Sequence, residues 1–379
     1  MQLVVAGTSA RLLTEAAARE GHQALALDAF GDLDTRRAAR RWQPLAHPGS
    51  LDPDPALLLP ALARAAREDA ASAWIAGGGF DAAPAWLAEA EALLPRLGSP
   101  AASLRALRDP VAWFGALARE SIAHPATCFE LPPVAEREQW LVKDPLGSGG
   151  WQVRPASRVD ALRPGHWVQR IAVGRPMSAL FVAYADGASL VGCQRQRTIH
   201  LGHLPHVYAG VIGPMVLSAP AQAAVRHAIE ALSRSFALRG LASLDFILGP
   251  DAASISVLEL NARPSASMAL YPRLPLIGAH LAACHGELLP DLDDAGAPLC
   301  GHAIVYADRG FKLSAAAADW LAQQSDRHDL PQAGLAFERG DPVCSLSLRA
   351  AAPDADAESL DTKLLHAGAH CLASLEALA

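Results

Sequence analysis

The chain has 379 residues, a formal net charge of -7 and a hydrophobic content of 51%. This length predicts two or three units with separate cores. No apolar run approaches the roughly 20 residues that cross a bilayer, and no Lys/Arg cluster offers a face to phosphates, so we expect no membrane and no nucleic-acid partner. The strand-like first eight residues, unlike a secretory leader, predict a cytoplasmic protein. The six cysteines form no CxxC pair, so neither a zinc knuckle nor a disulfide scaffold is expected.

The first hundred residues alternate short apolar runs with helical stretches, which predicts a parallel sheet in a Rossmann-like domain over residues 1–98. We expect strands at 3–6, 24–28 and 72–76 and helices at 10–20 and 55–69. The first turn, from Gly7 to Arg11, lacks the GxGxxG spacing, which disfavours a dinucleotide dehydrogenase. The run Gly77 to Gly79 fits either a backbone nest for an anion or a tight turn between a strand and a helix.

Residues 99–290 read as strands with few helices, which predicts an α+β unit after the α/β unit. In its second half we expect a helix at 221–238 and strands at 241–248 and 254–260. Residues 291–379 carry Gly and Pro at short intervals, typical of short strands joined by tight turns. We therefore expect a small C-terminal β-rich extension.

An apolar strand ending at Lys143 runs into a glycine-rich segment. Glycine amides can approach phosphate oxygens and an ammonium group can neutralise them, so this segment is a candidate triphosphate site. It is not a Walker loop, because the lysine precedes the glycines, and a simple hairpin turn is the alternative. The candidate binding residues are Lys143, Gly147, Ser148, Gly149 and Gly150.

Two acidic residues stand at apolar strand positions, Asp245 in Leu-Asp-Phe-Ile and Glu259 in Leu-Glu-Leu-Asn. Burying such carboxylates is costly without a compensating cation, and hard oxygen ligands suit Mg²⁺, with Mn²⁺ as an alternative. Alternation along the second strand puts Asn261 on the same face as Glu259, and a hairpin would add Asp245. These three are the predicted metal ligands; a salt bridge for Glu259 and a turn cap for Asn261 are the alternative.

Together these residues resemble the ATP-grasp superfamily, in which a lysine and a glycine-rich loop face an acid, acid, asparagine set. The resemblance covers about residues 1–290, and the string from Glu259 to Pro264 is its most specific part. It implies an ATP-grasp domain over 99–290, with a nucleotide subdomain at 99–172 and a metal subdomain at 173–290. It also implies that ATP and Mg²⁺ are bound and that a linker contacts adenine through its backbone, at Gln169, Arg170, Ile171 and Ala172.

The resemblance further implies basic groups for the transferred phosphate and for the reacting carboxylate. Arg195 and Arg197 lie on the strand that usually supplies the first, and Arg263 fits the second, so these three are the candidate catalytic residues. Two departures lower the expected nucleotide affinity. The segment around Arg108 lacks the second nucleotide lysine, for which Arg108 is a possible substitute, and the ribose-binding acid is replaced near Pro176.

More narrowly, the chain is similar to ATP-grasp proteins of tetrahydromethanopterin and methanofuran cofactor pathways, which include tyramine-glutamate ligase-like enzymes. The resemblance therefore implies a ligase that joins a small-molecule carboxylate to an amine through an acylphosphate, with glutamate as a candidate. A carboxylase-like or purine-pathway enzyme with a small acceptor, and a non-catalytic ATP-binding scaffold, are the alternatives. A homo-oligomer is compatible with the sequence.

The histidines His200, His203 and His206 recur at intervals of three, but Gly202 and Pro205 prevent a helix from aligning them. A zinc site is therefore disfavoured. A loop over the substrate is expected instead, with a solvated turn as the alternative.

Overall fold

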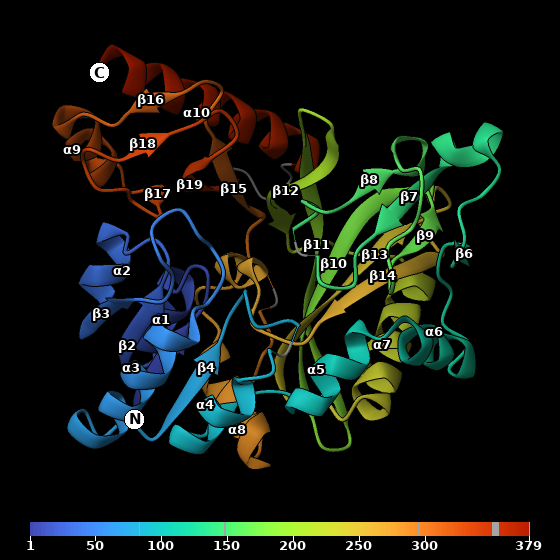
Figure 1. Ribbon diagram of the computed structural model, residues 1–379, viewed down its shortest axis with the longest axis horizontal. Helices are drawn as coiled ribbons and strands as arrows, with labels where there is room; N and C mark the ends of the chain where they lie inside the picture. Colours follow the sequence, from blue (N-terminus) through green and yellow to red (C-terminus); the bar gives the residue numbers. More distant parts are fainter. Residues whose placement is uncertain (83, 148, 295, 351–355, 379) are drawn as a thin grey trace.

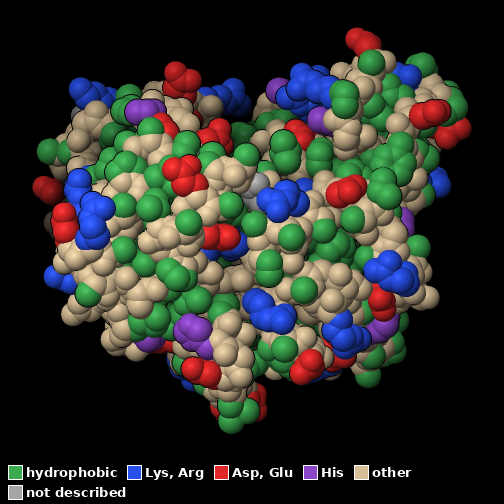
Figure 2. Space-filling view, turned by 60° about the horizontal axis from the view of Figure 1, so that its bottom comes forward, with side chains coloured by type: hydrophobic (Ala, Val, Ile, Leu, Met, Phe, Trp, Pro, Cys, Tyr) green, Lys and Arg blue, Asp and Glu red, His purple; other side chains and the backbone are tan. Residues whose placement is uncertain are grey.

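The computed structural model describes residues 1–82, 84–147, 149–294, 296–350 and 356–378. Figure 1 shows the N-terminal region in blue, packed below the C-terminal region in red, with the middle of the chain forming the other side of the molecule. Within the described residues no helix is both long and apolar enough to cross a membrane. On the face drawn in Figure 2, acidic and basic side chains are interspersed.

The N-terminal region is built on a five-stranded parallel sheet with the order β3-β2-β1-β4-β5. The expected strands and helices are present. Helix α3 begins where Asp54 accepts a hydrogen bond from the Ala56 N–H at 2.8 Å and Pro55 occupies the first turn. The strands are β1 (Gln2–Ala6), β2 (Gln23–Asp28), β3 (Arg41–Pro44), β4 (Ala73–Ala76) and β5 (Arg96–Leu97). The helices are α1 (Arg11–Arg19), α2 (Leu33–Ala38), α3 (Pro55–Glu68) and α4 (Leu87–Leu93).

Two helices that the sequence analysis did not predict follow this domain: α5 (Ala101–Arg108) and α6 (Pro110–Arg119). Asp109 ends the first and caps the second by accepting from the Val111 N–H at 2.9 Å. A four-stranded antiparallel sheet comes next, with the order β6-β9-β7-β8 and a small core of its own. It consists of β6 (Thr127–Cys128), β7 (Trp140–Lys143), β8 (Arg154–Pro155) and β9 (Trp167–Arg170), with the short helices η1 (Val134–Gln139) and η2 (Ala156–Arg158).

The centre of the molecule is an eight-stranded antiparallel sheet with the order β14-β13-β10-β11-β12-β15-β19-β17. Alternate residues of β10 serve two cores. Phe181 packs in the cluster that holds helix α7, whereas Leu180 and Val182 pack with helix α8 and the N-terminal domain. These elements are β10 (Arg175–Tyr184), β11 (Gly187–Leu201), β12 (Leu204–Gly213), α7 (Ala219–Ser235), β13 (Gly240–Leu248), β14 (Ile255–Asn261), η3 (Ala266–Leu270) and α8 (Leu276–His285).

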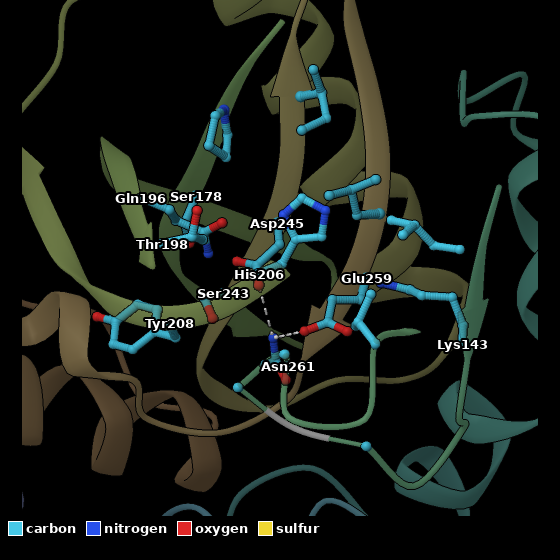
Figure 3. Close-up of a pocket in the computed structure, with 18 of the residues that line it drawn as sticks. Lys143, Ser178, Gln196, Thr198, His206, Tyr208, Ser243, Asp245, Glu259 and Asn261 are labelled. Atoms are coloured by element: carbon cyan, nitrogen blue, oxygen red, sulfur yellow. Dashed lines mark hydrogen bonds between the residues drawn. The ribbon is translucent and has the colours of Figure 1, made fainter. Parts of the chain in front are cut away.

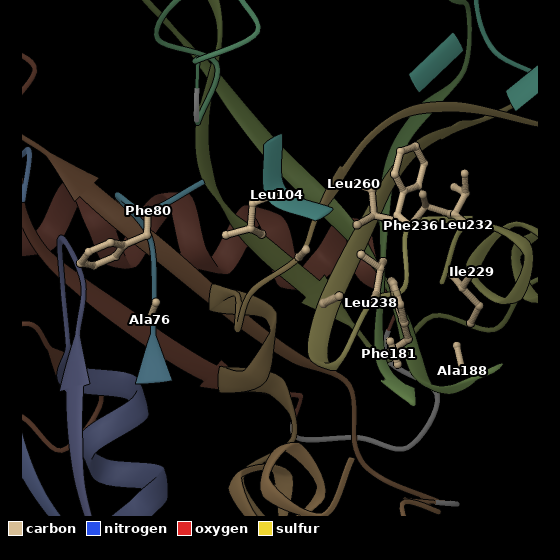
Figure 4. Packing of buried hydrophobic residues seen from close by; sticks show 14 of the residues in the cluster. Ala76, Phe80, Leu104, Phe181, Ala188, Ile229, Leu232, Phe236, Leu238 and Leu260 are labelled. Carbon is tan, nitrogen blue, oxygen red and sulfur yellow. The ribbon is translucent and has the colours of Figure 1, made fainter. Parts of the chain in front are cut away.

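One hydrophobic cluster runs without interruption from the N-terminal domain to α7 (Figure 4). Phe80 and Leu104 occupy its N-terminal end, while Phe236 and Leu232 lie at the other end, beside Phe181 of the central sheet. Such a shared core predicts that the N-terminal domain and the central sheet are held in one fixed relation.

The C-terminal region adds strands to the central sheet and packs helices against them. Its strands β15, β19 and β17 continue the central sheet, and its described residues include helix α9 and the 21-residue helix α10, which was not predicted. Leu360, Leu364 and Leu375 of α10 are buried in the C-terminal core. The elements are β15 (Cys300–Tyr306), β16 (Phe311–Lys312), α9 (Ala315–Gln323), β17 (Arg327–His328), β18 (Ala336–Phe337), β19 (Pro342–Arg349) and α10 (Ala357–Ala377).

A buried ion pair joins the two ends of the chain. The Arg11 guanidinium of α1 lies 2.7 Å from the Asp329 carboxylate, which directly follows β17. Arg11 also contacts Glu15 at 3.0 Å and Asp34 at 3.7 Å. The carboxylates of Glu15 and Asp34 converge with His328 closely enough to hold an ion, but the Arg11 charge already compensates this cluster.

Candidate functional site

A cavity of about 550 Å³ lies between the four-stranded sheet and the central sheet. It receives side chains from both sheets and from the segments that connect them (Figure 3). Most of the residues predicted from the sequence line it: Lys143, Gly147, Gly149, Gly150, Gln169, Arg170, Ile171, Ala172, Asp245, Glu259, Asn261 and Arg263. Ser148 lies outside the described residues.

The three predicted metal ligands are neighbours on β13 and β14. The two strands form the expected hairpin, and Asp245 stands directly opposite Glu259 in the register. The Asn261 side-chain amide donates to Glu259 Oε1 at 3.2 Å and to Asp245 Oδ2 at 3.4 Å, drawn as dashed lines in Figure 3. Two carboxylates and an amide are thus gathered on one face of the sheet.

The charges of this pair are unequal. Burial, and then the Glu259 charge, raise the pKa of Asp245 above its usual range, against hydrogen bonds from Ser178 and Gln196. Burial also opposes ionisation of Glu259, but the positive charges of Lys143 and Arg108 hold the pKa of Glu259 below its usual value. The surroundings therefore favour ionisation of Glu259 over ionisation of Asp245.

A divalent cation fits this donor set. Two half-buried carboxylates that repel each other are relieved by a positive charge between them, and Mg²⁺ prefers oxygen ligands of this type. Asp245 and Glu259 are the residues that would hold it, together with the amide oxygen of Asn261 once that amide, whose NH2 group faces both carboxylates, is turned over. The observation that carries the fit is the geometry: Asp245 stands opposite Glu259 in the strand register, and the Asn261 amide lies within 3.4 Å of Asp245 and 3.2 Å of Glu259.

Lys143 and the glycine-rich loop form the opposite wall. Lys143 ends β7, and its side chain extends toward Glu259 in Figure 3. Gly149 and Gly150 have φ values of +62° and +78°, which other residues rarely adopt. The Gly149 carbonyl accepts a hydrogen bond from the Tyr208 N–H at 3.0 Å, so the loop is seated on β12. An ammonium and a close-fitting backbone thus face the carboxylates across the cavity.

The predicted adenine linker follows β9 along the edge of the cavity. Gln169 is buried, and Arg170 is exposed. The Arg170 N–H donates to Ala126 O and the Ile171 N–H donates to Gln139 O, both at 2.8 Å. These two N–H groups are therefore not free to bind adenine in this arrangement. Adenine would have to bind to other backbone groups of the linker.

The three candidate arginines separate into two groups. Arg263 lines the cavity, whereas Arg195 and Arg197 do not. Alternation along β11 turns Gln196 and Thr198 into the cavity instead. The geometry corrects the catalytic prediction for Arg195 and Arg197.

The reason is the position of α10. Arg197 lies 2.5 Å from Asp361, and Arg195 lies 2.8 Å from the same carboxylate and 2.5 Å from Glu358. These three ion pairs place both guanidinium groups on the side of the sheet that α10 covers. The two arginines therefore hold the C-terminal helix in place.

The histidines also separate. His206 of β12 lines the cavity, and burial followed by the Lys143 charge lowers the pKa of His206. His200 and His203 do not line it, and within the described residues the three do not form a group able to hold a metal. The segment is a strand hairpin, β11–β12, and not the expected loop over the substrate.

Several polar residues of the site were not predicted from the sequence. Ser178 and Gln196 bond to Asp245, and Tyr208 and Thr198 line the same wall. Ser178 lies on β10, Gln196 and Thr198 on β11, and Tyr208 on β12. Side chains alternate between the two faces of a strand, so this alternation is the signal that would have found them. The Gly77 to Gly79 run forms a tight turn, in which the Gly77 N–H donates to Ala6 O at 2.7 Å and the Gly78 carbonyl accepts from the Thr8 N–H at 2.9 Å.

The comparison with protein families agrees with this geometry, because residues 108–267 match the model described as an ATP-grasp domain. The chain carries an ATP-grasp domain. The match includes Lys143, the linker and all three predicted metal ligands. No curated protein matches the chain.

Solved structures share the fold of this chain at low sequence identity. A biotin carboxylase from Campylobacter jejuni is 12% identical with a TM-score of 0.67, covering 92% of this chain and 87% of that one. An L-amino acid ligase from Bacillus licheniformis is 14% identical with a TM-score of 0.65, covering 96% of each chain. An N5-carboxyaminoimidazole synthetase from Staphylococcus aureus is 11% identical with a TM-score of 0.65, covering 97% of this chain and 96% of that one.

Proposed function

We propose that the protein is an ATP-dependent ligase that activates a carboxylate as an acylphosphate and joins it to an amine. The observation that supports this most directly is the opposition, across one cavity, of Lys143 with its glycine loop and the Asp245–Glu259–Asn261 set. An ammonium and a divalent-cation site on opposite walls suit a triphosphate between them. Magnesium, when bound, offsets the charge on the transferring phosphoryl group.

The reaction has two steps. A carboxylate oxygen of the substrate attacks the γ-phosphorus, the bond to the bridging oxygen breaks, and ADP leaves. An amine nitrogen then attacks the acyl carbon, phosphate leaves, and the nitrogen releases a proton. Lys143 neutralises the phosphates, and Arg263 orients the carboxylate and stabilises its developing oxyanion. No residue of the chain needs to form a covalent intermediate.

For the substrate we propose an amino acid, with glutamate first, in the biosynthesis of a one-carbon cofactor. The support is the resemblance of the strings around Gln194, Tyr208 and Asn261 to amine-to-glutamate ligases, and the shared fold of an L-amino acid ligase. A second candidate is transfer to a small acceptor such as bicarbonate. It is favoured by the shared fold of a biotin carboxylase and an N5-carboxyaminoimidazole synthetase.

The test is a screen for ADP release from MgATP with pairs of carboxylates and amines, beginning with glutamate and aromatic amines. Bicarbonate, formate and ammonia form the second arm. The matched control is Glu259→Gln, which keeps the size of the side chain and removes its charge. We expect ADP release that requires both substrates and is lost in the control, because phosphoryl transfer depends on positioned charge.

The outcomes separate the alternatives. Release that depends on bicarbonate without an amine favours the carboxylase-like function. ATP binding without ADP release for any pair favours a non-catalytic scaffold. Activity that survives in Glu259→Gln contradicts the proposed metal site.

A further inference from the structure

Asp81 belongs to the N-terminal domain but lies beside the proposed active site. It follows β4 in the turn formed by Gly77 to Gly79, at the carboxyl edge of the parallel sheet. The strand order reverses between β1 and β4, and open α/β sheets commonly bind ligands at such a reversal. Gly79 has a φ of +97°, and a Cβ there would lie 3.0 Å from Pro53, so the turn that presents Asp81 requires glycine.

Two arginines from different segments converge on this carboxylate. Arg263 Nε lies 2.7 Å from Asp81 Oδ1, and Arg108 Nη2 lies 3.3 Å from the same oxygen. The side chains of Asp81, Arg108 and Arg263 are only 11%, 12% and 19% exposed. Burial opposes ionisation of Asp81, but Arg263 and then Arg108 hold its pKa below the usual range. The three therefore form a charged, largely desolvated cluster.

Arg263 also faces the metal carboxylates, because it lines the cavity and its charge acts on both Glu259 and Asp245. A long guanidinium side chain beside two carboxylates would be drawn onto them and would occupy the space of the cation. A carboxylate that binds the guanidinium from another direction opposes its movement toward Asp245 and Glu259. Asp81 provides this carboxylate.

We propose that Asp81 is a positioning residue, which holds Arg263 away from Asp245 and Glu259 and directed toward the phosphoryl group in transfer. The inference rests on the proposed function. It makes the N-terminal domain a part of the active site, because the carboxylate that fixes Arg263 comes from a segment 182 residues earlier in the chain. Arg108 shares the charge of Asp81 and completes the cluster.

The experiment titrates inorganic phosphate into full-length protein saturated with MgADP, with binding followed by calorimetry. Inorganic phosphate represents the phosphoryl group after its transfer. The phosphate Kd can therefore be measured without knowing which carboxylate substrate accepts this group. The variants are Asp81→Asn, which removes only the charge, and Asp81→Glu, which keeps the charge but displaces it. The control is Asp329→Asn, which removes the other buried arginine pair between domains, at a position whose φ of +53° asparagine tolerates.

We expect the phosphate Kd to rise about tenfold or more in Asp81→Asn, as for a misplaced charge-assisted hydrogen bond, and to rise less in Asp81→Glu. The MgADP Kd stays within about threefold in both, and Asp329→Asn changes neither constant. A merely structural role would weaken MgADP and phosphate together. That result, or an unchanged phosphate Kd in Asp81→Asn, overturns the inference and leaves the proposed function standing.

The remaining outcomes are also decisive. If the wild-type protein does not bind MgADP, the proposed function fails, and this inference fails with it. If it binds MgADP but not phosphate, Arg263 is not directed at the phosphoryl group and the inference alone is overturned. If Asp81→Asn does not fold, Asp81→Glu decides, because an unchanged phosphate Kd in that variant contradicts positioning by this carboxylate.

Discussion

Gly150 packs so closely against His206 that a Cβ on residue 150 would lie 1.9 Å from the His206 carbonyl oxygen. The Gly149 carbonyl accepts the Tyr208 N–H at 3.0 Å, and the Trp151 ring meets the Tyr306 ring edge-on with centroids 6.3 Å apart. The glycine-rich loop thus touches the central sheet at three consecutive residues. A side chain at position 150 would lift the loop away from the proposed phosphate site.

Gly150→Ala should therefore weaken MgATP binding by about tenfold, because the clash is with backbone atoms that cannot turn aside. The matched control is Gly21→Ala. Gly21 has the same φ of +78° but has nothing within 4 Å of the new Cβ. Both variants lose roughly 1 kcal/mol or more of stability from the positive φ, but only the first loses affinity by calorimetry. Equal MgATP affinities in the two variants would contradict the seating of the loop.

Asp245→Asn should stabilise the metal-free protein at pH 8. The raised pKa of Asp245 means that the folded state holds this proton more tightly than the unfolded chain does. As the pH rises through the unfolded pKa, folding loses stability, and the loss is complete above the folded pKa. A gain of about 1 kcal/mol would raise Tm by a few degrees in a domain of this size. Thermal melts without metal test this, and a lower Tm for Asp245→Asn would refute it.

Glu259→Gln should shift Tm in the opposite direction under the same conditions. The lowered pKa of Glu259 contributes stability that is present above its unfolded pKa and is lost as the pH falls through the folded pKa. Neutralising Glu259 removes this contribution at pH 8. Two shifts of the same sign would show that the charges in this pair are assigned incorrectly.

Mn²⁺ binding, as a probe for Mg²⁺, should weaken as the pH is lowered through the raised pKa of Asp245. The ion requires both carboxylates ionised, so each pH unit below that pKa weakens binding by up to about tenfold. Spin-resonance titrations with Mn²⁺ at pH 8 and pH 6 measure the change. Asp245→Asn binds more weakly at pH 8 and loses most of the pH dependence. The same dependence in the variant would assign the proton to another group.

Local sequence patterns could predict the site residues that lie on one strand or on two strands joined by a short hairpin. Glu259 and Asn261 were predicted to share a face because residues alternate with period two along a strand, and Asp245 was added by the short hairpin that joins the two neighbouring strands. Lys143 followed from its place at a strand end before glycines. These features depend on neighbours in the sequence, and the structure brings them to one cavity.

Features that depend on distant segments were not predictable in the same way. Whether Arg195 or Gln196 faces the cavity is set by which face of β11 is turned toward it when β11 pairs with β10 and β12. The partners of the arginines arrive more than 160 residues later, on helix α10, which was not predicted from the sequence. The pairing of Asp81 with Arg263 likewise carries no local signal, because each acquires its partner only when the domains pack.

Asp361→Asn should lower stability without lowering activity per folded molecule. Asp361 is 28% exposed and binds two guanidinium groups that are 11% and 8% exposed, so its loss leaves two buried charges poorly paired. Because the carboxylate is partly solvated, we expect a loss of about 2 kcal/mol, less than for a fully buried pair.

Glu358→Gln is the control. Its side chain is 77% exposed and binds Arg195 alone, so the loss should be below about 1 kcal/mol. Denaturant unfolding measures stability, and ADP formation per folded molecule measures activity. If Asp361→Asn instead abolished turnover at unchanged stability, Arg195 and Arg197 would act in catalysis after all, and α10 would have to be counted as part of the active site.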